Sequence, residues 1–496
     1  MKKKEALYDL IKSLTQNEKR FFKIYASRHT IGEKNNYVKL FESIDKQSSY
    51  DEQKIRKNNN SVSGHFSAEK NYLYNLILEC LDSYHKDSSI DRQISKYINV
   101  ARVLAEKKLD EQSVKIIEKA KKLSEEYNRF ENIISLTALQ KNTGFNRDTI
   151  TNEELGNYYS EIFLSLHQLN IKLEFNKIHD ELLLQRRRMG PVKNAEELKD
   201  LKKFYNQPYF RHASSINSFD ANIFYLLAKI EYSRILRDNK KCRTYCLKLL
   251  SLFHLHVNRI ADNINQYIYL LNVFIVEGLY QGRREEADAS LERLISIPSL
   301  TGEKTITNDV KVKLFEVYYT CKTDIAIKFR DYESALPDIP TIERELEKME
   351  GLMTPSFNLV LKSNIACVYF GAGQYKQSLK WCNKIMNDPP EYRQDIFYIV
   401  QMLYLLIHFE LGNQLILPSL MKSTYRNLYK RQRVYQFENI FLKYLRLFLR
   451  AETKKDQKLL FIQFREDLVP LIDNKFENLV FTDIDIMGWI DKRIKL

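Results

Sequence analysis

Residues 364–379 read NIACVYFGAGQYKQSL, the pattern of a helix, a tight turn and a second helix. Apolar residues fill most positions up to Phe370, Gly373 interrupts the run, and the apolar spacing resumes after Tyr375. Glycine is common directly after a helix because it adopts a left-handed backbone without steric cost. The stretch therefore predicts an antiparallel helical hairpin.

The same succession of a long segment, a break and a second long segment recurs on both sides of this stretch. It runs over residues 265–297, 309–349, 357–386 and 392–429. The turn glycines Gly373 and Gly412 lie 39 positions apart, and Gly282 lies 91 positions before Gly373. A weaker copy around Tyr332 and Ala335 fits between them. The chain therefore contains a helical repeat, with a period longer than the ~34 residues typical of the shortest such repeats.

This repeat resembles the tetratricopeptide repeat, most clearly at residues 357–390. The positions that match the family pattern are Asn364, Ile365, Ala366, Tyr369, Gly373, Tyr375, Ser378 and a closing Pro389 or Pro390. The resemblance implies an all-α fold, an α-solenoid of stacked antiparallel helix pairs whose curved surface binds a protein or peptide. It also implies that Ser363, Asn364 and Phe370 contact the partner. Asn364 has a second interpretation, a structural side chain that bonds a neighbouring hairpin.

Four regions are expected along the chain. They are a helical N-terminal module at 1–90, helical hairpins at 91–190, a linker at 191–219, and repeats with C-terminal capping helices at 220–496. Asp220 is expected to cap the first helix of the last region. The N-terminal module resembles no family that we can name.

Within the N-terminal module, Thr15 and Glu18 have the spacing of a capping box and predict a helix start. The helices at 15–28 and 68–84 could form a helix-turn-helix reader of DNA, with Lys19, Arg20, Lys23 and Arg28 facing phosphates. Against that interpretation, Phe21, Phe22 and Tyr25 have the character of packing residues.

Composition narrows the class of protein. Hydrophobic residues make up 44% of the chain and charged residues 29%, which is sufficient for a folded core. Only 13 Gly and 10 Pro disfavour an all-β fold, because its turns use these residues heavily. The six cysteines lie scattered in apolar segments, as in a reducing compartment. No run reaches the ~20 apolar residues of a membrane span, so we expect a cytoplasmic protein without membrane contact.

The sequence offers no constellation for catalysis. His254 and His256 diverge on a helix, and Cys242 and Cys246 lack the second ligand pair of a metal site. Nucleotide-binding and hydrolase motifs are absent from the sequence. We therefore expect no enzyme activity, no cofactor and no metal.

A basic stretch with tyrosines at 422–450 is the second candidate surface. Lys422, Arg426, Lys430 and Arg433 fall on one helix face, with Tyr429 beside them. The net charge of +14 favours acidic partners. The expected function is a non-catalytic scaffold or adaptor that binds a protein or peptide. The alternative is a nucleic-acid-binding regulator that uses the N-terminal helices or this stretch. A solvated outer face is the structural explanation of the same charges, and the oligomeric state stays open.

Overall fold

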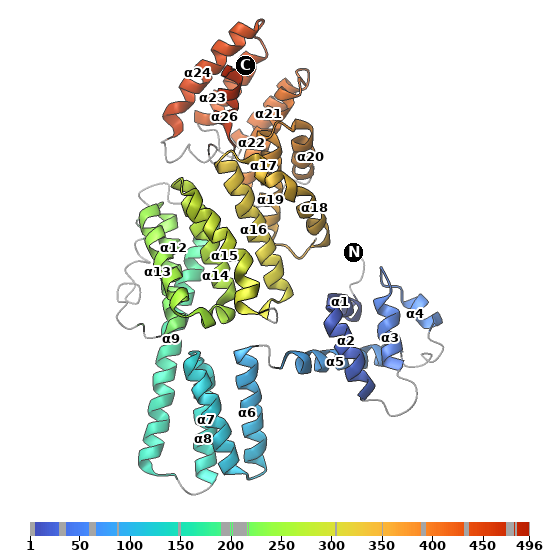
Figure 1. Cartoon of the computed structure of the whole chain (residues 1–496), viewed down its shortest axis with the longest axis vertical. Coiled ribbons are helices and arrows are strands. Elements are labelled where there is room, and N and C mark those ends of the chain that lie inside the picture. The colour runs from blue at the N-terminus through green and yellow to red at the C-terminus, as the bar shows by residue number, and fades with distance from the viewer. Residues whose placement is uncertain are drawn as a thin grey trace. The chain divides into compact units, whose positions relative to one another are not determined.

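The computed structural model shows a helical protein (Figure 1). It describes residues 5–28, 36–58, 66–86, 89–146, 150–189, 199, 201, 216, 218–302, 305–349, 351–387, 393–430, 436–472, 481 and 484–495. All elements found in these ranges are helices, as the repeat pattern predicts. None of the described helices is long and apolar enough to cross a membrane. The chain divides into two compact units, Met1–Leu169 and Asn170–Leu496, and each is described by itself.

The first unit begins with five helices around a small core. They are α1 (Ala6–Ser13), α2 (Gln16–Arg28), α3 (Asn36–Asp45), α4 (Glu52–Asn58) and α5 (Phe66–His85). Phe22, Phe41 and Leu73 meet in the core of these helices, each at most 1% exposed. The predicted capping box is confirmed, because the Glu18 N–H donates to Thr15 Oγ1 and the Thr15 N–H donates to Glu18 Oε2.

Three further helices complete the first unit together with part of a long fourth one. They are α6 (Ile90–Glu106), α7 (Asp110–Glu126), α8 (Phe130–Asn146) and α9 (Asn152–Met189). Helices α6 and α7 form a hairpin, and α7 packs against α8. The division between the two compact units falls inside α9, after Leu169.

The second unit consists of helix couples that follow one another along the chain. Its helices are α12 (Phe219–Ile235), α13 (Asn239–Leu255), α14 (Ile264–Tyr280), α15 (Arg284–Thr301), α16 (Asn308–Lys328), α17 (Tyr332–Ala335), α18 (Ile339–Lys348), α19 (Pro355–Gly371), α20 (Tyr375–Met386), α21 (Gln394–Glu410), α22 (Leu417–Lys430), α23 (Gln436–Phe448), α24 (Lys454–Ile472) and α26 (Ile486–Lys495). The couples α12–α13, α14–α15 and α19–α20 pack most closely. First helices of successive couples also touch, since α14 contacts α16, and α16 contacts α19.

The turns between paired helices share one backbone geometry. The second residue after the helix has positive φ, and the N–H of the residue that follows it donates to the carbonyl five positions earlier at 2.7 to 3.0 Å. The positive-φ residues of these turns are Lys108, Asn128, Arg237, Gly282, Arg330, Gly373 and Gly412. This bond satisfies a carbonyl that the helix end would leave unpaired. The geometry thus recurs even where the residue is not glycine.

Small side chains allow the paired helices to cross closely. In α20, Ser378 is fully buried and its hydroxyl donates to the Ala366 carbonyl of α19 at 2.7 Å. Ser113 of α7 makes the equivalent bond to the Ala101 carbonyl of α6 at 2.8 Å. A larger side chain at either serine would separate the backbones. The small residue predicted early in the second helix therefore has a definite packing role.

Two expectations need comment. The prediction that Asp220 caps α12 is wrong, because Ser218 is the cap and its hydroxyl accepts the Ala221 N–H. Asp220 lies inside the first turn, buried, and pairs at 2.8 Å with Arg259 of the 3₁₀ turn that follows α13. The expected linker at 191–219 lies mostly outside the described residues.

Candidate functional site

The predicted partner-binding residues of α19 lie in the core. Ser363, Asn364 and Phe370 are only 4%, 8% and 6% exposed. The Asn364 amide donates to Thr323 Oγ1 at 3.1 Å and to Asp324 Oδ1 at 2.6 Å, both on α16. This is the structural interpretation of Asn364, a bond to the neighbouring helix couple. Neighbouring helices cover these three side chains, and their contact with a partner stays a prediction.

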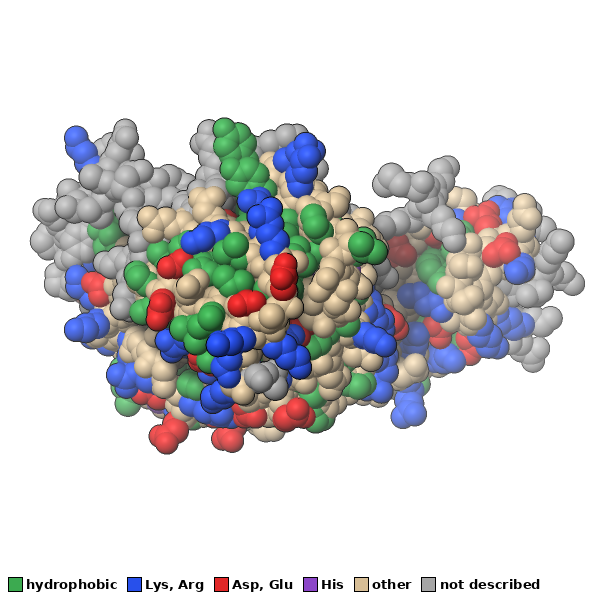
Figure 2. Space-filling model, turned by 90° about the horizontal axis from the view of Figure 1, so that it is seen from above, with side chains coloured by type: hydrophobic (Ala, Val, Ile, Leu, Met, Phe, Trp, Pro, Cys, Tyr) green, Lys and Arg blue, Asp and Glu red, His purple; other side chains and the backbone are tan. Residues whose placement is uncertain are grey.

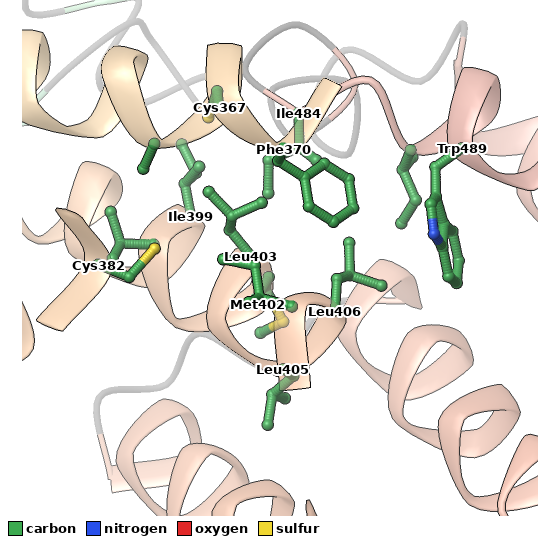
Figure 3. Close-up of a cluster of buried hydrophobic side chains, with 14 of the residues drawn as sticks. Cys367, Phe370, Cys382, Ile399, Met402, Leu403, Leu405, Leu406, Ile484 and Trp489 are labelled. Atoms are coloured by element: carbon green, nitrogen blue, oxygen red, sulfur yellow. The ribbon is translucent and has the colours of Figure 1, made fainter. Parts of the chain in front are cut away.

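Phe370 nevertheless has a second role, because its ring forms part of the wall of a pocket in the second unit. In Figure 3 its ring extends from α19 past Leu403 and Leu406 of α21, toward the side where Trp489 lies on α26. Phe370 lines a pocket of about 190 Å³. Its other walls come from the end of α16, the start of α17 and the turn before it, the last turns of α19, the start of α20, and α26 with the residues before it.

A half-buried carboxylate, that of Asp485, joins α26 to its neighbours at this place. Asp485 precedes α26 and accepts three hydrogen bonds, from Arg330 Nη2 at 2.8 Å, the Tyr332 hydroxyl at 3.1 Å and the Gly488 N–H at 2.9 Å. The last bond caps the helix, and the other two join α26 to the turn between α16 and α17. Burial first, and then the Asp485 charge, raise the pKa of Tyr332 well above its ordinary value.

A second carboxylate, that of Glu410, forms hydrogen bonds with other side chains of α26. Glu410, at the end of α21, accepts from Trp489 Nε1 at 2.6 Å and from Arg493 Nε at 2.9 Å. Its side chain is 4% exposed, so the pairing with Arg493 stabilises a charge that would be costly alone. Burial, followed by the neighbouring Glu410, raises the pKa of Tyr375 to about 12. The hydroxyls of Tyr332 and Tyr375 therefore stay protonated near neutral pH.

Two glycines permit the close packing around the pocket. A Cβ on Gly371 would lie 2.2 Å from Cζ of Tyr332, and one on Gly488 would lie 2.1 Å from Asp485 Oδ2. Such distances are shorter than any van der Waals contact. The ring of Tyr332 thus rests directly on the backbone of α19. The sequence marks Tyr332 only as a repeat position, and no sequence pattern singles out Asp485.

The first part of the basic stretch lies on α22, within the described residues. Lys422, Tyr425, Arg426 and Tyr429 are exposed, and the two tyrosine rings stack with centroids 6.1 Å apart. The side chain of Lys430 and all of Arg433 lie outside the described residues. Neither Lys422 nor Arg426 forms an ion pair with another described residue. The described α22 side chains thus form a face of two cations and two aromatic rings, called the α22 face below.

Other basic residues are already neutralised. Lys19 pairs with Asp45 and Lys23 with Glu42, each at 2.6 Å, while Lys443 lies 3.5 Å from Asp467. On the face shown in Figure 2, described Lys and Arg side chains are interspersed with acidic and hydrophobic ones. The net positive charge is therefore distributed and does not form one broad basic area there.

The expected absence of catalytic chemistry is untested. Cys242 and Cys246 are buried thiols on one helix, and the Cys246 contact together with burial raises the pKa of Cys242. Burial lowers the pKa of His254. Among the described residues there is no group of three metal-ligating side chains. A thiol with a raised pKa is a poor nucleophile, so Cys242 is a poor candidate for a catalytic thiol.

Comparison of the chain with protein-family models, with characterised proteins and with solved structures finds no match.

Proposed function

We propose that this protein is a non-catalytic scaffold built as a tetratricopeptide-like α-solenoid that binds a protein partner on its curved surface. The support for a solenoid is that first helices of successive couples touch, while the turns repeat one hydrogen-bonded geometry. A couple that buries one flank against the next couple leaves its remaining faces for partners. Repeats of this kind present extended surfaces rather than enclosed active sites.

The α22 face is the observation that carries the proposal. Tyr429 is 68% exposed and stacks on Tyr425, with Lys422 and Arg426 one turn apart beside them. Tyrosine and arginine are enriched in protein interfaces because they combine apolar contact with hydrogen bonding. Two cations that form no ion pair with another described residue favour an acidic segment. The partner is therefore an acidic stretch of another protein.

The test compares two doubly charge-reversed variants of the full chain. Lys422→Glu with Arg426→Glu removes the cations of the α22 face, while Lys454→Glu with Lys455→Glu makes the same change in net charge at the exposed start of α24. Proteins retained from a native extract are identified, and binding of the recovered partner is titrated. We expect the α22 variant to weaken binding at least tenfold and the α24 variant to bind as the unaltered chain does. Equal binding by both variants would contradict the role of this face.

Nucleic acid is the alternative ligand, because bases also stack on exposed tyrosines. The ion pairs of Lys19 and Lys23 count against the N-terminal helices as a phosphate-binding surface. A salt titration with duplex DNA and single-stranded RNA separates the two functions. Phosphate contacts make affinity fall steeply with salt for every sequence. Tight, salt-sensitive binding of either nucleic acid that the α22 variant loses would favour the alternative.

A further inference from the structure

The pocket beneath α26 has aromatic walls. Tyr332, Phe370, Tyr375 and Trp489 line it, and the rings of Phe370 and Tyr375 lie 5.5 Å apart between centroids. Binding pockets of drug-sized ligands typically measure ~300 to 1,000 Å³, so a volume of about 190 Å³ suits a smaller molecule. One aromatic ring with a short substituent fits that size. Aromatic walls favour such a ring through stacked and edge-on contacts.

The charged residues around the pocket determine which ligand charge is favoured. Among the described lining residues, Arg330, Asp485 and Lys492 are charged, and Arg330 already pairs with Asp485. Lys492 is exposed and forms no ion pair with any described residue, so its ammonium lies where the pocket meets solvent. A Cβ placed on Gly373 would lie 4.0 Å from the Lys492 Nζ, so the cation projects over the α19–α20 turn. The uncompensated charge of the described lining residues is therefore positive.

We propose that this pocket binds a small aromatic carboxylate. The ring occupies the space between Tyr332, Phe370 and Trp489, and the carboxylate extends outward to the Lys492 ammonium. A cationic ligand is disfavoured because Asp485, the acidic lining residue, already accepts three hydrogen bonds from the protein. This ligand site is independent of the partner surface on α22, since it involves none of the same residues.

Ligand binding here would also tighten the contact between distant parts of the second unit. The pocket joins the α16–α17 turn, the end of α19 with the start of α20, and α26, and a molecule that touches all three stabilises their association. The protein would then unfold at a higher temperature in the presence of the ligand. This effect gives a second readout that does not depend on the partner.

The experiment uses the full chain and calorimetric titration with phenylacetate, 4-hydroxyphenylacetate and indole-3-acetate. Phenylacetamide is the neutral probe of the same shape. The variant is Lys492→Gln, and Lys495→Gln is its matched control, an exposed lysine on the same helix outside the pocket. Both positions are exposed, so neither change endangers the fold.

We expect at least one of the carboxylates to bind, and the amide to bind several-fold more weakly. Lys492→Gln should weaken carboxylate binding about fivefold, the effect of one partly solvated ion pair, and Lys495→Gln should leave it unchanged. The binding carboxylate should also raise the unfolding temperature. Absence of binding at millimolar concentration, equal affinity for acid and amide, or an unchanged affinity in Lys492→Gln would each overturn the proposal.

Discussion

Single residues in this protein are constrained most where backbone and side chain touch directly. Gly371 is such a position, because the Tyr332 ring lies against its α-carbon. Gly373, two positions later, is constrained for a different reason, its φ of 75°. The first glycine leaves room for a neighbour, and the second supplies a conformation. The two requirements predict different responses to substitution.

Replacing Gly371 with alanine should destabilise the second unit by about 1–3 kcal/mol, because the added methyl overlaps the Tyr332 ring. Gly156, which lies in α9 with nothing within 4 Å of an added Cβ, is the control. Its replacement by alanine should stabilise by about 0.5–1 kcal/mol, since glycine is unfavourable inside a helix. Urea unfolding measures both. A Gly371→Ala variant as stable as the unaltered protein would refute the overlap.

Glu316 should make stability depend on pH. Burial raises its pKa, although the carboxylate accepts the Thr354 N–H. Between the unfolded pKa, near 4.5, and the higher folded pKa, the folded state holds the extra proton. Stability therefore falls as pH rises through that window, and the loss persists at neutral pH. Glu316→Gln keeps an acceptor without the charge, so it should stabilise by about 1 kcal/mol at pH 7 and have no such benefit below pH 4. Urea unfolding across this range gives the answer, and a benefit that instead grows toward acid would contradict the assigned shift.

At the scale of elements, the paired helices end in one turn geometry whatever the residue. Lys108 and Gly412 occupy equivalent positions, with φ of 58° and 72°. A left-handed conformation is unfavourable for lysine and free of cost for glycine. The residue type at the turn therefore affects the stability of the hairpin more than it affects the backbone conformation of the turn.

Substitutions at Lys108 and Gly412 should change stability in opposite directions. Lys108→Gly should stabilise the α6–α7 hairpin by about 0.5–1 kcal/mol, and Gly412→Ala should destabilise the α21–α22 turn by a similar amount. Thermal unfolding of both variants is the measurement. Effects of the same sign in both would show that the turn conformation is not what matters.

The helical elements were largely predictable from sequence, because apolar spacing and turn residues are local signals. The hairpin at Gly373 and the capping box of Thr15 and Glu18 are confirmed in detail. The Asp220 cap failed because Ser218 competes two residues earlier, and Asp220 is drawn into a buried ion pair. The pocket could not be foreseen, since local patterns do not reveal which distant turns meet α26.

The exposure of candidate residues was the least predictable property. Ser363, Asn364 and Phe370 match a repeat pattern, but the covering of that face depends on α16, α21 and the C-terminal helix. Lys422 and Arg426 are exposed, because the buried side of α22 is carried by Leu417, Met421 and Leu428. Helix periodicity fixes which residues share a face, and tertiary packing fixes which face stays open.

For the whole molecule, we expect the two compact units to unfold in separate transitions, so a destabilising substitution in one unit should lower the transition of that unit alone. Leu73→Ala creates a cavity in the first unit, where Leu73 is fully buried, and should lower one calorimetric transition by the equivalent of about 2–4 kcal/mol. Gly371→Ala should lower the other transition. If each variant shifts both transitions equally, the chain unfolds as one cooperative body.

Arg330 and Asp485 are separated by 155 positions in the chain, yet they form one side of the pocket. During translation at roughly 5–20 residues per second, the α16–α17 turn waits on the order of ten seconds or longer before its counterpart leaves the ribosome. Until α26 is made, Tyr332 lacks the helix that covers it, as do Phe370 and the Glu410 carboxylate once they have been synthesised. A nascent chain stalled before residue 485 therefore displays uncovered aromatic side chains that chaperones can recognise.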